Sequence, residues 1–185
     1  MKIKLILSSL IIAGVLSATQ AMAADYKIDT AHTFVTFKVS HLGYSFINGR
    51  FDDFDGMFSY DTNNPGASKV NVTINAKSID TNHAERDKDL RSDNFLDVSK
   101  YPSITFESTA YLVGSDSDTL KGNVTIFGIT KAVEIKVKLV GEGKDPWGGY
   151  RSGFRGNVTL NSADFGMPEW VGDLEIDLDI EGIRI

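Results

Sequence analysis

The chain of 185 residues contains no cysteine and only three histidines. Without cysteine, disulfides, iron–sulfur clusters, thiolate metal sites and a lipid-modified N-terminal cysteine are all excluded. The spacing of His32, His41 and His83 matches no metal-ligand signature. His32 and His41 flank one expected strand, which would separate them by roughly 30 Å. We therefore expect no metal site and no catalytic cofactor.

Signatures of catalysis are also absent. The chain has no Gly-x-Ser-x-Gly element and no glycine-rich phosphate loop. Carboxylates are abundant, but most of them occupy polar positions of expected strands, as in 173–181, where a solvated face explains them. We therefore expect no catalytic residue and interpret the protein as a non-enzyme.

The N-terminal segment has the three parts of a secretory signal. Lys2 and Lys4 precede an apolar stretch over 5–16, and Ala21-Met22-Ala23 supplies the small-x-small pattern that signal peptidase cleaves. This pattern predicts a signal peptide over 1–23 and a location in the periplasm. No later segment approaches the roughly 20 apolar residues of a membrane-spanning helix, so we do not expect an integral membrane protein.

The mature chain, residues 24–185, is expected to form a single domain. The net charge of −6 becomes −8 when Lys2 and Lys4 are removed. An acidic surface disfavours nucleic acid as a partner.

Alternation of apolar and polar residues dominates the mature chain and is typical of strands with one buried face. Over 173–181, four aliphatic residues alternate with five acidic ones. The same alternation recurs over 33–40, 54–60, 69–75, 103–113, 119–127, 133–139 and 152–160.

One segment departs from this pattern. Residues 82–92 lack β-branched side chains and are rich in helix formers, which predicts a short helix capped by Asn82.

Eight antiparallel strands with one apolar face form either a sandwich or a barrel, and an eight-stranded barrel can hold one small ligand. Ser108, Gly122 and Gly156 fall on the expected inward face in mid-strand. Small residues there leave space for an apolar ligand, or they mark bulges that let the sheet curl. The sequence leaves both readings open.

Several ordered segments together resemble the YceI-like family of exported bacterial proteins, from about residue 25 to about residue 183. They are YKIDTAHTFVTFKVSHLG, GRFDDFDGMF, KSIDTNHAERDKDLRSDNFLDVSKYPSITFEST, LKGNVTIFGITKAVEIKVKL, DPWGGYRSGFRGNVTLNSADFGM and VGDLEIDLDIEG. The resemblance implies an all-β, eight-stranded antiparallel lipocalin-like barrel with one short helix near 82–92. It also implies a periplasmic protein that holds a polyisoprenoid or isoprenoid quinone, and it supplies no catalytic residue.

The candidate ligand-binding residues follow from the inward positions of the alternation. We expect the polar head group at a barrel mouth, near Arg86, Arg91 or Tyr150, and we expect Trp147 among the ligand-binding residues as an aromatic ring that lines or plugs a mouth. The tail is expected along Phe37, Val39, Val72, Ile74, Phe106, Ser108, Val124, Ile126, Val137, Phe154, Val158, Ile176 and Leu178.

Three alternatives remain at this point. One is an enzyme acting on a lipid or quinone in the same lumen, for which only Ser108 and His41 offer polar groups. Another is an integral outer-membrane barrel, which also combines a signal peptide with alternating strands. The third is a packed-core interaction domain that binds no ligand. Homo-oligomerisation is left open.

Overall fold

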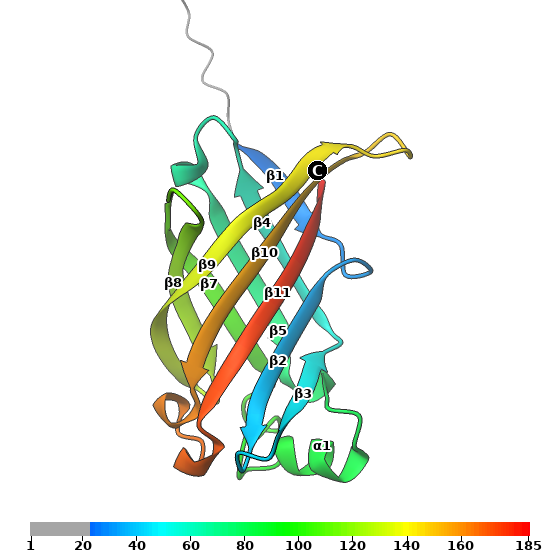
Figure 1. Cartoon of the computed structure of the whole chain (residues 1–185). Coiled ribbons are helices and arrows are strands. Elements are labelled where there is room, and N and C mark those ends of the chain that lie inside the picture. Colours follow the sequence, from blue (N-terminus) through cyan, green and yellow to red (C-terminus); the bar gives the residue numbers. More distant parts are fainter. Residues whose placement is uncertain (1–22) are drawn as a thin grey trace, which may run out of the picture.

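The computed structural model describes residues 23–185, so the signal peptide predicted over 1–23 lies outside the described residues apart from Ala23. All strand pairings are antiparallel, and they form one continuous sheet (Figure 1). The strands are β1 (Ala24–Ile28), β2 (Phe34–His41), β3 (Ser45–Phe51), β4 (Phe54–Tyr60), β5 (Lys69–Asn75), β6 (Ile79–Asp80), β7 (Ser103–Leu112), β8 (Asp118–Ile126), β9 (Ile129–Lys144), β10 (Tyr150–Asn161) and β11 (Asp173–Arg184).

Eight of these strands close into a ring in the order β1-β4-β5-β7-β8-β9-β10-β11, because β11 pairs back to β1. This ring confirms the predicted all-β, eight-stranded antiparallel barrel. The closing strand β11 has two partners along one edge. Its residues Gly182–Arg184 pair with β1, while Leu174–Asp179 pair with β2. The remaining strands β3 and β6 follow β2 outside the ring.

Each of the eight predicted segments is a strand, but the composition of the ring differs from the prediction. The ring includes β1, which was not predicted, and leaves β2 outside. Strand β1 has five residues, of which only Tyr26 and Ile28 are buried, so it is too short for alternation to identify it. Strands β3 and β6 were also missed, because β3 is largely exposed and β6 has only two residues.

The helix α1 (Ala84–Leu90) confirms the predicted short helix and lies at the end of the barrel opposite the C-terminus (Figure 1). Its cap is His83, whose Nδ1 accepts a hydrogen bond from the Arg86 backbone N–H at 3.2 Å. The predicted cap Asn82 is wrong, since its φ of 59° places it in a tight turn before the cap. No helix among the described residues is long and apolar enough to cross a membrane. Short 3₁₀ helices are η1 (Pro65–Ala67), η2 (Ala76–Ser78), η3 (Ser162–Phe165) and η4 (Glu169–Val171).

Candidate functional site: the barrel cavity

The barrel contains an apolar cavity of about 190 Å³. Successive side chains of a strand point to opposite faces, so the apolar face of each strand is turned toward the interior of the barrel and lines the cavity. Most of the residues expected to contact a ligand tail lie on its wall. These are Phe37, Val72, Ile74, Phe106, Val124, Ile126, Val137, Phe154, Val158, Ile176 and Leu178.

Three other expected residues lie away from the cavity wall. Val39 is on β2 beyond the ring, where it pairs with Leu174 of β11. The Ser108 hydroxyl accepts a hydrogen bond from the Val70 backbone N–H at 2.8 Å and so serves the sheet. Trp147 lies in the β9–β10 turn with 77% of its surface exposed, and the Arg151 guanidinium carbon lies 5.5 Å from its ring centroid.

The two expected head-group arginines hold the backbone before α1. Arg86 donates from Nε to the Thr81 hydroxyl and from a terminal nitrogen to the Thr81 carbonyl, both at 2.7 Å. Arg91 donates to the carbonyls of Lys77 and Ile79. Because α1 lies opposite the end where β10 begins, these arginines and the Trp147 turn flank different ends of the barrel (Figure 1).

One end of the cavity is bounded by Tyr60, Ser68 and Tyr111, which we call the tyrosine end. Their side chains are 6%, 7% and 6% exposed, respectively, and all three line the cavity. The Tyr111 hydroxyl donates to Asp118 Oδ2 at 2.5 Å. The Ser68 hydroxyl is buried without any hydrogen-bond partner. The three residues line this end mainly with their carbon atoms, so the cavity surface stays apolar here as well.

Sequence reasoning missed Tyr111 because a bulge shifts the alternation of β7. The pairing of β7 with β8 changes register between Ser108 and Ala110. Past that point Tyr111 is buried, while Leu112, which the uninterrupted alternation would turn inward, is 47% exposed. A bulge adds one residue to a strand and so reverses which side chains face inward. Tyr60, by contrast, lies on the inward face of a predicted strand and could have been included.

The tyrosine hydroxyls at this end are held in their protonated form. Burial raises the pKa of Tyr60, a hydrogen bond with Thr62 opposes this in part, and nearby carboxylates, chiefly Glu142, raise the pKa further. Burial and the hydrogen bond to Asp118 raise the pKa of Tyr111. Both groups therefore remain neutral hydroxyls at neutral pH.

The opposite end, which we call the aliphatic end, is closed by Ala76, Leu96 and Phe165. Phe165 and Ala76 are each 1% exposed, and Leu96 is 6% exposed. Phe165 is carried by η3, which begins where the Asn161 side chain accepts a hydrogen bond from the Ala163 backbone N–H. This end is packed as an ordinary hydrophobic core.

The two mid-strand glycines differ in the space beside them. A Cβ built on Gly122 would lie 2.4 Å from Cζ of Phe106, so the ring already covers this glycine. A Cβ on Gly156 would lie 3.3 Å from both Ile135 and Leu178 side chains. The Phe106 ring can lie against the wall only because Gly122 has no side chain. Gly122 therefore serves close approach of the Phe106 ring, while Gly156 lies on the cavity wall.

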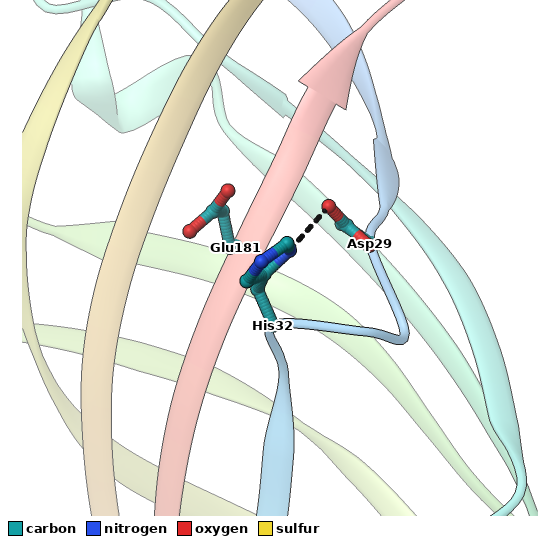
Figure 2. A group of neighbouring side chains, drawn as sticks. All are labelled: Asp29, His32 and Glu181. Carbon is teal, nitrogen blue, oxygen red and sulfur yellow. Dashed lines mark hydrogen bonds and ion pairs between the residues drawn. The ribbon is translucent and has the colours of Figure 1, made fainter. Parts of the chain in front are cut away.

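One group of potential metal ligands, Asp29, His32 and Glu181, lies on the outside of the barrel (Figure 2). Its carboxylates are bonded to Arg151, which also binds Asp145 at 2.9 Å. The bond from Arg151, followed by that from His32, lowers the pKa of Asp29 to about 2. The guanidinium supplies the positive charge that these carboxylates need, so the cluster acts as an ion network joining the β1–β2 connection to β10 and β11.

Comparisons with known proteins agree with this architecture. The family model described as YceI-like domain matches residues 26–182. A UPF0312 protein of Pseudomonas aeruginosa is 56% identical over 174 residues, which cover 91% of each chain. BcnA of Burkholderia cenocepacia shares the fold with a TM-score of 0.75 at 21% identity, over 83% of this chain and 98% of that chain. A polyisoprenoid binding domain from Saccharophagus degradans shares the fold with a TM-score of 0.67 at 14% identity, over 89% of this chain and all of that one (100%). With the family model spanning nearly the whole barrel, the chain belongs to the YceI-like family.

Proposed function

We propose that this protein binds the tail of a long-chain isoprenoid or isoprenoid quinone in its barrel cavity and acts as a periplasmic carrier. The observation that carries the proposal is the apolar cavity inside the barrel, which is lined by residues of most strands. The name of the Saccharophagus degradans domain, which describes polyisoprenoid binding, supports this ligand class.

Burial of hydrocarbon supplies the affinity. Removing apolar surface from water contributes about 25 cal/mol per Å², and a long tail offers several hundred Å². Binding of such a tail needs no polar contact along the strands, which agrees with the aliphatic wall. We propose no chemical step: Ser108 is hydrogen-bonded to the Val70 backbone, and His41 is not among the residues that line the cavity.

The proposed location rests on the predicted signal peptide. Cleavage after Ala23 would leave residues 24–185 as one barrel domain. Osmotic shock should release the protein without detergent, and its intact mass should correspond to a chain beginning at Ala24. Release only with detergent would favour an outer-membrane barrel instead.

The ligand itself is best tested by native mass spectrometry of protein purified from its own periplasm, followed by organic extraction. We expect a stoichiometric adduct that extracts as a polyprenyl lipid or quinone, and the same spectrum reports the oligomeric state. A bare mass that persists after incubation with isoprenoid quinones would favour the packed-core alternative.

Variants can then test the cavity as the binding site. Ile126→Asp places a charge on the wall and should abolish loading, whereas Val113→Asp alters a residue that is 65% exposed and should not. Val158→Phe narrows the cavity without adding charge and should reduce loading if Ile126→Asp does not fold. Full loading of a folded Ile126→Asp protein would contradict the proposed site.

A further inference from the structure

The end of the barrel that carries α1 also carries two loops with exposed hydrophobic side chains (Figure 1). One is the β2–β3 turn, where Leu42 and Tyr44 are 72% and 88% exposed. The other is η4, where Trp170 is 73% exposed. Val39 of β2 pairs with Leu174 of β11, so both loops extend beyond the same end of these two neighbouring strands. Three large side chains therefore project into solvent from one end of the molecule.

Leu42 has a backbone conformation that disfavours its own side chain. Leu42 and Gly43 are the central residues of a turn in which the Tyr44 backbone N–H donates to the His41 carbonyl at 3.0 Å. Their φ angles are 55° and 76°. A turn with positive φ at both central residues favours Asn followed by Gly, and a bulky side chain there is strained. Because Leu42 neither suits the turn nor is buried in a core, the fold does not account for this side chain.

The chain around these side chains is nearly free of charge. Residues 39–49 contain no Asp, Glu, Lys or Arg, although these types make up 24% of the whole chain. In the η4 loop, residues 165–172, Glu169 alone is charged. Tyr and Trp favour the boundary between lipid and water, where their rings are buried while the hydroxyl and indole N–H groups stay hydrated. The composition of both loops therefore fits the surface of a lipid bilayer.

A tryptophan at the opposite end of the barrel has different surroundings. Trp147 is about as exposed as Trp170, but it lies two residues after Asp145, and the Arg151 guanidinium carbon is 5.5 Å from its ring centroid. Trp170 instead packs edge-to-face on the buried ring of Phe95, with 6.0 Å between centroids. The Trp170 indole is thus supported from within the protein and has an uncharged surface toward solvent.

We propose that the α1 end of the barrel docks on a lipid bilayer through the β2–β3 turn and Trp170. The contact is shallow and reversible, because few side chains take part and α1 places charges of both signs at the same end. The bilayer surface is uncharged overall, since a chain with a net charge of −6 is repelled by anionic lipid. Docking would hold a lipid carrier against a membrane, yet it does not depend on what the cavity contains.

Flotation of the mature protein with vesicles of pure phosphatidylcholine measures docking. We expect Leu42→Asn to bind these vesicles roughly 3- to 10-fold more weakly than the wild type, because less hydrocarbon is buried. The same variant should keep or raise the midpoint of thermal unfolding, since Asn suits a positive φ. Val113→Asn, the matched control, changes an exposed aliphatic residue just after β7 and should leave vesicle binding unchanged.

The two tryptophans of the chain permit a second measurement that keeps the turn intact. Trp147→Phe leaves Trp170 as the only tryptophan, and Trp170→Phe leaves Trp147. Vesicles of brominated phosphatidylcholine should quench the fluorescence of Trp170 and leave that of Trp147 unquenched, because bromine atoms in the lipid tails quench only indoles that enter the bilayer surface.

Several results would overturn the proposed docking. Vesicle binding that is absent, or equal in the wild type and Leu42→Asn, would do so, as would quenching of Trp147 in place of Trp170. A lower thermal midpoint in Leu42→Asn would mean that the side chain stabilises the protein itself. A dimer in sedimentation that Leu42→Asn dissociates, without vesicle binding, would assign this end to a second copy of the chain. Loading of the cavity is reported separately by native mass spectrometry, so each of these results leaves the proposed function standing.

Discussion

The two ends of the barrel interior are both buried but differ in their chemistry. At the aliphatic end, Phe165 and Ala76 are each 1% exposed and belong to one buried hydrophobic cluster. Nearby buried polar groups are paired, as in the bond between the Thr81 hydroxyl and the Asp87 carboxylate. At the tyrosine end, Ser68 is similarly buried but unpaired.

This difference bears on stability. A core gains stability when its polar groups are paired and its volume is filled. We infer that the aliphatic end contributes more to the stability of the barrel than the tyrosine end does.

The largest effect is expected at the aliphatic end. Phe165→Ala removes a ring that is 1% exposed and should lower the free energy of unfolding by about 3–5 kcal/mol, because a cavity remains. Urea denaturation measures it. Phe34→Ala, at a position that is 53% exposed, is the control and should cost far less. Equal losses of unfolding free energy in both variants would contradict the inference that the aliphatic end stabilises the barrel.

A smaller effect is expected where the Phe106 ring lies over Gly122. Gly122→Ala would bring a Cβ within 2.6 Å of the Glu107 carbonyl as well as into the ring, so the strands or the ring must move. We expect a loss of about 1–3 kcal/mol in urea denaturation. Gly143→Ala, whose Cβ would meet no atom within 4 Å, should change stability little. An unchanged free energy of unfolding in Gly122→Ala would mean that the position of the Phe106 ring does not depend on this glycine.

Acid should weaken the ion network beside β1 and leave the aliphatic end intact. The pKa of Asp29 is about 2 in the folded protein, against an ordinary value of 3.8, so its stabilising charge is present above about pH 4 and lost as the pH falls toward 2. Thermal unfolding at several pH values should show a drop of several degrees across this window. Asp29→Asn should be less stable at neutral pH and show a smaller drop. An unchanged pH profile in that variant would show that Asp29 does not contribute.

The smallest effect is expected from Ser68→Ala in the ligand-free protein. Removing a buried hydroxyl that has no partner should leave the free energy of unfolding unchanged or raise it by up to about 1 kcal/mol. Urea denaturation of delipidated protein measures this. A clear loss of stability would mean that the hydroxyl is bonded within the protein, and it would remove the contrast between the two ends.

Much of the fold follows from local patterns in the sequence. Alternation identified all strands of the ring except β1, and the composition of 82–92 identified α1. The inward positions also identified most of the cavity wall, including Phe106 and Ile126. Period-two alternation depends only on the geometry of a single strand, so it can be recognised without knowing which strands pair.

Tertiary structure alone decided how the ring closes and where its tyrosine end lies. The division of the β11 edge between β1 and β2 depends on long-range pairing that no local pattern contains. The bulge after Ser108 reverses the inward face of β7 and brings Tyr111 to the cavity beside Tyr60 and Ser68. The sequence by itself therefore determined an all-β chain with an aliphatic face. Strand pairing and register, which bring together residues far apart in the chain, decided which residues line the cavity.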